Sequence, residues 1–209
     1  MNSCFEASLL VSPNGEILIA GVDEVGRGCI FGPVVAAAVV LPLSKIPQLI
    51  ELGVKDSKKL SAKRREDLVE PIQQMVVSWQ IQEASVSEID HLNILHASLL
   101  AMNRAVDNLK PCPDLCLIDG NFPLPKTELA QRNIVKGDSL SSAIASASIL
   151  AKVWRDNLIC ELAAQYPEYD LVNNKGYPTL KHKQALQTYG ISEMHRKTFA
   201  PCRNILLAN

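Results

Sequence analysis

The sequence predicts an α/β fold in which a sheet is flanked by helices. Short runs rich in β-branched residues alternate with longer segments of helical periodicity, and the order begins strand, strand, helix, strand. A chain of 209 residues with 47% hydrophobic content is long enough to bury one substantial core. Because no internal repeat, low-complexity segment or long linker divides it, we expect a single domain over residues 1–209, with 1–15 as a short N-terminal extension.

Three strands and a helix are predicted in the N-terminal part of the chain. The short β-rich run 17–24 and the Val/Ala run 33–41 predict two neighbouring strands joined by a short glycine-rich turn. Residues 61–76 have apolar residues at helical spacing, although Pro71 should kink or break that helix. Residues 77–84 alternate between apolar and polar side chains, which predicts a third strand.

The remaining residues predict two long helices, two short strands and a basic end. Apolar residues recur along 86–109, which predicts a single or broken helix packed on the sheet. The helix predicted over 138–164 begins with small side chains, so it can approach a sheet or another helix closely. The other predicted elements are a buried central strand at 115–118, a short strand at 134–135, a short helix at 179–188 and an irregular, basic C-terminal end.

Composition alone does not indicate a partner. Lys and Arg number 21 against 22 Asp and Glu, for a net charge of -1, so any surface that binds nucleic acid must be local. The six cysteines lack the spacing of a zinc site, and the N-terminal residues do not resemble a secretion signal. No apolar run reaches the roughly 20 residues that cross a bilayer. We therefore expect free thiols in a cytoplasmic protein.

Carboxylates follow the ends of predicted strands or begin a predicted helix. Asp23 and Glu24 end the first strand, Asp119 ends the central strand, and Asp138 opens the long small-residue helix. Ligands bind at strand ends in open α/β sheets, so these groups can converge there. Acidic groups that converge repel one another unless a cation lies between them, and Mg²⁺ prefers oxygen ligands. Two such ions about 4 Å apart can hydrolyse a phosphodiester.

Each carboxylate also has a purely structural explanation. Asp119 precedes a glycine, as in an ordinary turn, and Asp138 is followed by serines, as in a helix N-cap. Asp23 and Glu24 are harder to explain in this way, because charged residues are rarely buried without a partner. Neighbouring side chains on a strand point to opposite faces, so a bend near Gly26 or Gly28 would be needed to direct both toward one cluster.

Other residue types suited to nucleic acid lie beside these carboxylates and farther along the chain. Gly26 and Gly28 flank Arg27, so the backbone and a guanidinium can meet a sugar-phosphate chain there, although Gly-Arg-Gly is also a normal tight turn. Tyr177 follows Lys175 and has a ring suited to stacking on a nucleotide, although a turn or core tyrosine is equally ordinary. Two basic clusters are either solvated faces or phosphate contacts: Lys55, Lys58, Lys59, Lys63, Arg64 and Arg65, and Lys175, Lys181, Lys183, Arg196, Lys197 and Arg203.

Several longer motifs occur in a fixed order from about residue 17 onward. They are Gly-Val-Asp-Glu-Val-Gly-Arg-Gly (21–28), Gly-Pro-Val-Val-Ala-Ala-Ala-Val-Val (32–40), Asp-Ser-Lys-Lys-Leu-Ser (56–61), Ile-Asp-Gly (118–120), Lys-Gly-Asp (136–138), Ala-Ser-Ile-Leu-Ala-Lys-Val (147–153) with Arg155-Asp156, Asn-Lys-Gly-Tyr (174–177) and His-Arg-Lys-Thr-Phe-Ala-Pro (195–201). Together these motifs closely resemble the ribonuclease HII family of bacteria, and the combination is far more specific than any one motif.

The resemblance implies a ribonuclease H-like fold, a mixed five-stranded sheet flanked by helices. It implies an endonuclease that hydrolyses the RNA strand of RNA/DNA hybrids and cuts 5′ of ribonucleotides embedded in duplex DNA, leaving 3′-hydroxyl and 5′-phosphate ends. The cofactor it implies is Mg²⁺ or Mn²⁺, used in two-metal-ion catalysis. The residues that match the family's catalytic metal ligands are Asp23, Glu24, Asp119 and Asp138.

The resemblance also implies roles in substrate binding. Gly26, Arg27 and Gly28 match the segment that reads the RNA-to-DNA junction. Tyr177 matches the tyrosine that packs against the nucleotide there, and Lys58 matches a phosphate contact. We expect a monomer that requires no obligate protein partner and does not associate with a membrane.

Two other functions are compatible with parts of the sequence. A non-catalytic module that binds nucleic acid through the basic clusters would not need the four carboxylates. Another two-metal nuclease of the same fold, specific for DNA, would keep the carboxylates, and the fold alone does not exclude it. The Gly-Arg-Gly motif beside Asp23 and Glu24 favours an enzyme that senses a 2′-hydroxyl group.

Overall fold

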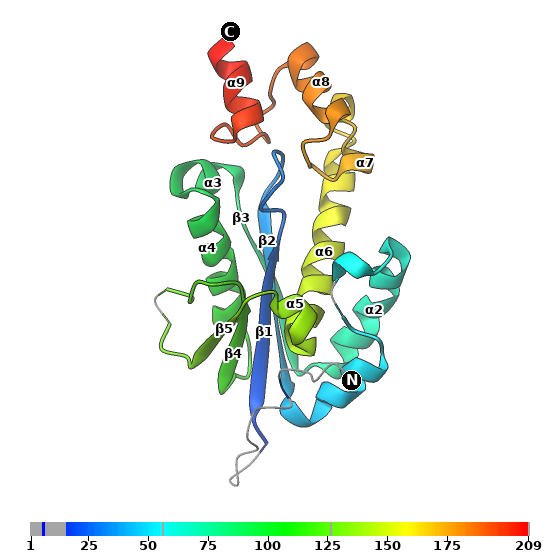
Figure 1. The fold of residues 1–209 in the computed structure, drawn as a ribbon, viewed down its shortest axis with the longest axis vertical. Helices are drawn as coiled ribbons and strands as arrows, with labels where there is room; N and C mark the ends of the chain where they lie inside the picture. The colour runs from blue at the N-terminus through cyan, green and yellow to red at the C-terminus, as the bar shows by residue number, and fades with distance from the viewer. Residues whose placement is uncertain (1–5, 7–15, 56, 126, 209) are drawn as a thin grey trace.

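The computed structural model describes residues 6, 16–55, 57–125 and 127–208, so the predicted N-terminal extension lies almost wholly outside the described residues. A mixed five-stranded sheet with the order β3-β2-β1-β4-β5 forms the centre of the molecule, as Figure 1 shows. This arrangement confirms the α/β fold class. The strands are β1 (Leu18–Val25), β2 (Val34–Pro42), β3 (Ser78–Ala84), β4 (Leu115–Asp119) and β5 (Gln131–Ile134).

The directions of the strands determine where the carboxylates lie. Strand β1 is antiparallel to β2 and parallel to β4, and β5 is parallel to β4. The carboxyl ends of β1, β4 and β5 therefore share one edge of the sheet. Because Val22 is in register with Ile118, the residues that follow them, Asp23 and Asp119, are neighbours across the two strands.

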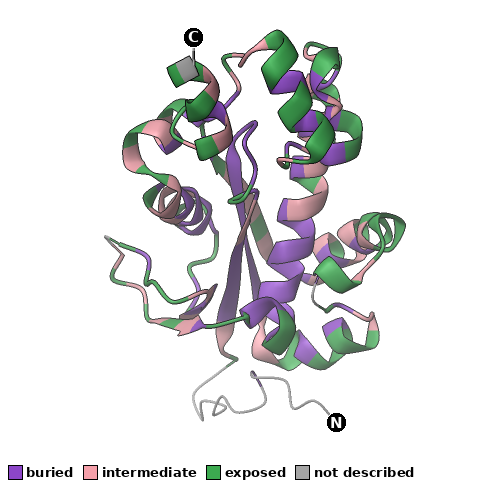
Figure 2. Cartoon of the chain, turned by 45° about the horizontal axis from the view of Figure 1, so that its top comes forward, coloured by how far each residue is buried: buried purple, intermediate pink, exposed green. Residues whose placement is uncertain are grey.

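Two long helices cover opposite faces of the sheet. Helix α6 (Ser142–Leu162) packs on β1 and β2 from one side, and α4 (Ile94–Asp107) packs on β1, β2 and β3 from the other (Figure 1). All but the last residue of β2 are buried, which accounts for its uninterrupted Val/Ala sequence. Figure 2 shows buried residues along the strands and on the first half of α6.

The small side chains of α6 bring this helix very close to β1. A Cβ atom at Gly21 would lie 2.1 Å from the backbone carbon of Ala143, so only glycine fits at that position. Ser141 begins the helix as its N-cap, and its hydroxyl accepts a hydrogen bond from the Ile144 amide. The Glu6 carboxylate accepts a hydrogen bond from the Ala143 amide, 3.0 Å away, and places a negative charge at the positive end of the helix.

Two predicted helices each form two shorter ones. The stretch 86–109 is broken at Asn93, which has a φ of 70° and separates α3 (Val86–Leu92) from α4. The Asn93 side chain accepts hydrogen bonds from the Leu95 and His96 amides, so it caps the second helix. The predicted helix 138–164 is interrupted at Ser141, which is extended and separates α5 (Gly137–Leu140) from α6.

The structure corrects three expectations about secondary structure. Helix α2 (Ala62–Met75) continues through Pro71, so the predicted break does not occur. The carbonyl of Asp67, which loses its helical donor, belongs to an exposed residue, where the loss costs little. A short helix, α1 (Ile46–Glu51), occupies a segment for which no helix was predicted, and α9 (Ala200–Ala208) replaces part of the predicted irregular end.

The C-terminal helices pack around the connection between β1 and β2. Helices α8 (Leu180–Tyr189) and α9 lie at the upper end of the molecule, above the tip of this connection, and α7 (Leu171–Asn174) lies beside it (Figure 1). Phe31 of the connection is fully buried in a small third core, edge-on to Tyr166 and His195. The C-terminal part of the chain therefore fixes the loop that follows Asp23 and Glu24.

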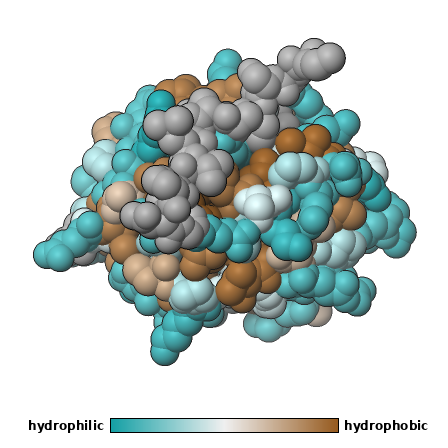
Figure 3. Space-filling view, turned by 90° about the horizontal axis from the view of Figure 1, so that it is seen from below, coloured by the Kyte–Doolittle hydropathy of each residue, from teal (hydrophilic) through white to brown (hydrophobic). Residues whose placement is uncertain are grey.

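The remaining global features concern thiols and surface. All five cysteines that the structure describes are free, as predicted, whereas Cys4 lies outside the described residues. Among the described helices, none is both long enough and apolar enough to span a bilayer. At the end of the molecule seen in Figure 3, hydrophobic patches alternate with hydrophilic side chains.

Candidate active site

Asp23 and Glu24 lie at the carboxyl end of β1 and face opposite sides of the sheet. The strand pairs regularly with β2 through Val25, so the chain bends only after the pair, at Gly26, whose φ is +90°. Asp23 shares its face with Gly21 and is directed toward α6, where it is 4% exposed. Glu24 starts from the other face, as strand alternation requires, yet its carboxylate is close enough to interact electrostatically with Asp23 and Asp119.

Asp119 and Asp138 approach the same strand end from neighbouring segments. The Asp119 carboxylate accepts a hydrogen bond from the Gly137 amide at 2.6 Å, which joins the end of β4 to α5. Asp138 is buried, and its Oδ2 atom lies 2.9 Å from the Lys58 ammonium nitrogen. The alternative explanation of Asp138 as an N-cap is wrong, because the N-cap of α5 is Lys136, without a side-chain cap bond.

The carboxylates influence one another electrostatically. Burial raises the pKa of Asp23 well above its ordinary value, and the charges of Glu24 and Asp119 raise it further. Burial also raises the pKa of Glu24, as does Asp119, although Arg27 opposes this shift from 3.0 Å. Burial and the charge of Asp138 raise the pKa of Asp119. Holding these groups ionised therefore costs free energy unless a cation is present.

This donor set suits a hard divalent cation. Carboxylate oxygens are the ligands of Mg²⁺ in proteins, and the raised pKa values of Asp23, Glu24 and Asp119 are the expected signature of acidic groups that a cation would neutralise. Over the residues that the structure describes, no three or more acidic, thiol or imidazole side chains are arranged so that they could hold a metal ion together. The Lys58 ammonium instead supplies the positive charge beside Asp138.

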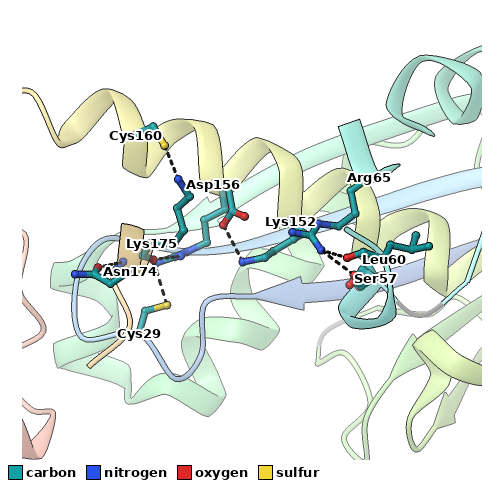
Figure 4. Close-up of polar contacts among 12 residues, drawn as sticks. Cys29, Ser57, Leu60, Arg65, Lys152, Asp156, Cys160, Asn174 and Lys175 are labelled. Carbon is teal, nitrogen blue, oxygen red and sulfur yellow. Dashed lines mark hydrogen bonds and ion pairs between the residues drawn. The ribbon is translucent and has the colours of Figure 1, made fainter. Parts of the chain in front are cut away.

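The segment that carries Lys58 is attached to α2 and α6. The Arg65 guanidinium donates to the backbone carbonyls of Ser57 and Leu60, at 3.0 and 2.7 Å, as Figure 4 shows. The hydroxyls of Ser57 and Ser148 are 2.9 Å apart, and Ser148 also hydrogen-bonds Asp23. Lys58, predicted to contact a phosphate, is thus held next to the carboxylates with an 80% exposed side chain.

The predicted nucleotide-binding residues are brought together above the carboxylates. A Cβ atom at Gly28 would lie 3.9 Å from the ring of Tyr177, so the Gly-Arg-Gly turn and the tyrosine are in contact range. The Tyr177 ring is 38% exposed, and the Lys152 ammonium lies 5.5 Å from its centroid. An ion pair of 2.8 Å with Asp156 holds Lys152 in place on α6 (Figure 4).

Three side chains of this region were not predicted as site residues. A fourth, Arg196, was placed in a basic cluster expected to be a solvated face or a set of phosphate contacts, and it is neither, because it is fully buried and donates to backbone carbonyls. Lys152 and Ser148 on α6 contact Tyr177 and Asp23, and Arg155 and Arg196 are fully buried beneath the glycine-rich loop. The only signal for them was their place within the longer sequence motifs. Arg155 and Arg196 also bond carbonyls of segments more than a hundred residues away, which residue spacing does not reveal.

A buried histidine pair supports the Tyr177 loop. The Nε2 atoms of His182 and His195 are 3.2 Å apart, and His182 Nδ1 lies 2.9 Å from the Tyr177 carbonyl oxygen. Burial lowers the pKa of His195 to about 3, and the neighbouring His182 contributes to this shift. Both rings therefore stay neutral at physiological pH and have a structural role.

Comparison with known proteins gives one consistent result. Residues 20–202 match the family model described as Ribonuclease HII. A protein of Trichormus variabilis named Ribonuclease HII is 55% identical over 186 residues, which are 89% of this chain and 83% of that protein.

Solved structures agree with this result. The ribonuclease H2 of Pyrococcus horikoshii OT3 has a TM-score of 0.79 and 28% identity, over 92% of this chain and 98% of that one. The ribonuclease HII of Archaeoglobus fulgidus, solved as a complex with PCNA, has a TM-score of 0.75 and 28% identity, over 88% and 95% of the two chains. The chain belongs to the ribonuclease HII family.

Proposed function

We propose that this protein hydrolyses the RNA strand of RNA/DNA hybrids and cuts on the 5′ side of ribonucleotides embedded in duplex DNA. Its family membership makes it a ribonuclease H endonuclease. In the proposed reaction a water oxygen adds to phosphorus, the bond from phosphorus to the preceding 3′ oxygen breaks, and that oxygen leaves as a hydroxyl. The products have 3′-hydroxyl and 5′-phosphate ends.

One observation carries the proposal. Asp23 and Asp119 meet at the carboxyl ends of two parallel strands, where burial raises the pKa of both. The charge of Asp119 raises the pKa of Asp23 further, and the charge of Asp138 raises that of Asp119. Glu24 approaches this point from the other face of the sheet, and Asp138 approaches it from α5. Such a group of carboxylates is electrostatically costly by itself and is suited to binding cations.

In this proposal Asp23, Glu24, Asp119 and Asp138 hold two divalent ions, Mg²⁺ or Mn²⁺. When bound, the ions supply Lewis-acid stabilisation for the phosphodiester and its leaving oxygen. The carboxylates orient the ions, and the Gly137 amide and the Ser148 hydroxyl orient the carboxylates of Asp119 and Asp23.

The substrate is positioned above these carboxylates. Gly26 and Gly28 allow the backbone to approach the ribose, where the 2′-hydroxyl both donates and accepts hydrogen bonds. The exposed face of Tyr177 stacks on the nucleotide, and Arg27 and Lys58 contact phosphates. When no metal is bound, the ion pair with Arg27 neutralises the Glu24 carboxylate, and the ion pair with Lys58 neutralises that of Asp138.

The proposal extends to the organisation of the protein. Residues 1–209 form one catalytic domain that acts as a monomer in the cytoplasm, without an obligate protein partner. The Archaeoglobus fulgidus protein was solved with PCNA, so a sliding clamp is the first partner to test by gel filtration. A stable complex would identify a partner, and elution of the protein alone at twice its own mass would contradict the monomeric form proposed here.

Cleavage of two matched duplexes tests the proposal. One duplex carries a single embedded ribonucleotide, the other is all DNA of the same sequence, and each is incubated with Mg²⁺, Mn²⁺ or EDTA. We expect a cut 5′ of the ribonucleotide with either metal, and none with EDTA or in the all-DNA duplex. Equal cutting of both duplexes would support a DNA nuclease, and no cutting with any metal would support a binding module.

A further inference from the structure

Two fully buried arginines lie beneath the Gly26–Gly28 turn and the Tyr177 loop. Arg155 of α6 and Arg196 of the segment before α9 are each 0% exposed. Buried arginines are normally paired with carboxylates. In the part of the chain that the structure describes, neither guanidinium forms an ion pair. Groups other than carboxylates must therefore accept their hydrogen bonds.

All hydrogen-bond partners of Arg155 are backbone carbonyls of two loops. Its Nε and Nη2 atoms donate to Pro33 and Phe31 of the β1–β2 connection, at 3.1 and 3.0 Å. Its Nη1 atom donates to the carbonyl of Lys175, two residues before Tyr177, at 2.9 Å. One planar guanidinium therefore fixes the distance between the two loops that the proposed function assigns to the nucleotide.

Arg196 bonds the same connection at two other carbonyls. Its Nε atom donates to the carbonyl of Gly32 at 2.9 Å, and its Nη1 atom donates to that of Arg27, inside the Gly-Arg-Gly turn, at 3.1 Å. Its Nη2 atom has no hydrogen-bond partner among the described residues, and the guanidinium lies 5.1 Å from the Phe199 ring centroid. Burial lowers the pKa of Arg196 to about 10, and the like charge of Arg155 adds to this shift.

The glycines of both loops leave space for Arg155. A Cβ atom at Gly26 would lie 2.2 Å from its Nε atom, and one at Gly176 would lie 3.4 Å from its Nη2 atom. The Ile30 amide donates to the Gly176 carbonyl at 2.9 Å, so the loops also bond each other directly. The turn and the tyrosine loop are thus assembled around the guanidinium.

We propose that Arg155 and Arg196 are positioning residues whose fork geometry sets the Gly26–Gly28 turn against Tyr177 and thereby determines the selectivity for an embedded ribonucleotide. The inference rests on the proposed function. Lysine preserves the charge but carries its N–H donors on one nitrogen atom, so it cannot bond three carbonyls in the fixed plane of a guanidinium. A misplacement of about 1 Å in a binding site can cost roughly 100-fold in rate.

The test compares R155K and R196K with a surface control, R104K. Arg104 is partly exposed and bonds Glu88 and the Glu83 carbonyl, not the carbonyls of the two loops, so its substitution reports on arginine loss alone. We measure kcat/KM for a duplex with one ribonucleotide and for a long RNA/DNA hybrid. The ratio of the two values should fall by about 10-fold or more in R155K and R196K and stay within 2-fold of wild type in R104K. An unchanged ratio in both loop variants overturns the inference.

A double-mutant cycle tests whether Arg155 acts through Tyr177. Tyr177→Ala should reduce kcat/KM for the single-ribonucleotide duplex much less in the R155K background than in wild type, whereas additive effects would contradict the role. Hydrogen exchange provides a readout independent of activity: the Ile30 and Gly32 amides should exchange faster in R155K while β4 amides do not change. Equal acceleration in both regions would indicate general destabilisation and overturn the inference. If wild type itself makes no ribonucleotide-dependent cut, the proposed function fails and the selectivity role fails with it. The hydrogen-exchange comparison separately shows whether Arg155 holds the two loops in place.

Discussion

The backbone of Ala143 lies directly against Gly21, with no room for a side chain between them. A Cβ atom at Gly21 would come within 2.1 Å of the Ala143 backbone carbon and 2.2 Å of its oxygen. Gly21 precedes Asp23 by two residues on β1, and Ala143 follows Asp138 by five residues. This contact therefore fixes the spacing between the elements that carry two of the candidate metal ligands.

The first prediction concerns Gly21→Ala. We expect overpacking to lower the free energy of unfolding by about 1–3 kcal/mol, measured by urea denaturation. Adding Ala143→Gly should not rescue the variant, because the clash is with the backbone of Ala143 and not with its side chain. Wild-type stability of Gly21→Ala would show that the helix and the strand separate easily.

The second prediction concerns the stability of metal-free Asp23→Asn. The folded-state pKa of Asp23 is raised, so its ionised form destabilises the fold, increasingly as the pH rises through that pKa. Removing the charge at pH 7 should raise Tm in EDTA, by about 2–4 °C for each kcal/mol of repulsion relieved. At a pH below the ordinary aspartate pKa of about 4, the difference should vanish. A lower Tm of the variant at pH 7 would contradict the proposed electrostatic cost.

The third prediction concerns the stacking surface of Tyr177. Tyr177→Ala should lower kcat/KM on the single-ribonucleotide duplex by roughly 5- to 150-fold, because base stacking is worth about 1–3 kcal/mol. Tyr177→Phe keeps the ring and should lose no more than a few-fold. Tyr189, 62% exposed at the end of α8, is the matched control, and Tyr189→Ala should have no effect. Equal losses in the two alanine variants would exclude a specific role for Tyr177.

The fourth prediction concerns acid sensitivity caused by His195. Its folded pKa of about 3 is far below the unfolded value of about 6.5, so the unfolded state binds protons first as the pH falls. The stability that neutral His195 contributes is present above pH 6.5 and is lost progressively toward pH 3. Between pH 6 and 4, His195→Gln should remove a slope of about 1.4 kcal/mol per pH unit, measured by urea unfolding. The exposed His91 is the control, and a parallel profile of His195→Gln and wild type would refute this account.

Much of the fold could be predicted because its strands and long helices are periodic. The β2 run is apolar throughout because both of its faces are covered, and the small residues of α6 correctly indicated a close approach to the sheet. The continuous helix through Pro71 could not be predicted, because it depends on the exposure of the Asp67 carbonyl. Helix α9 was missed because its short apolar segment packs on a core formed by distant residues.

The site was predictable to the extent that its residues end strands. Asp23 and Asp119 follow apolar runs, and the parallel pairing of β1 with β4 makes them neighbours. The roles of Arg155 and Arg196 could not be read from spacing, because each bonds carbonyls more than a hundred residues away. The ion pair of Lys58 with Asp138 also joins distant segments, 80 residues apart.

The central claim is that the carboxylates at the end of β1 and β4 carry the metal-dependent cut, and Asp23→Asn tests it most directly. The variant loses one candidate metal ligand and almost no volume. We measure its cleavage of a duplex with one embedded ribonucleotide in Mg²⁺ and its binding to the same duplex. The account predicts a loss of nearly all cleavage with binding retained. Cleavage at the wild-type rate would contradict it.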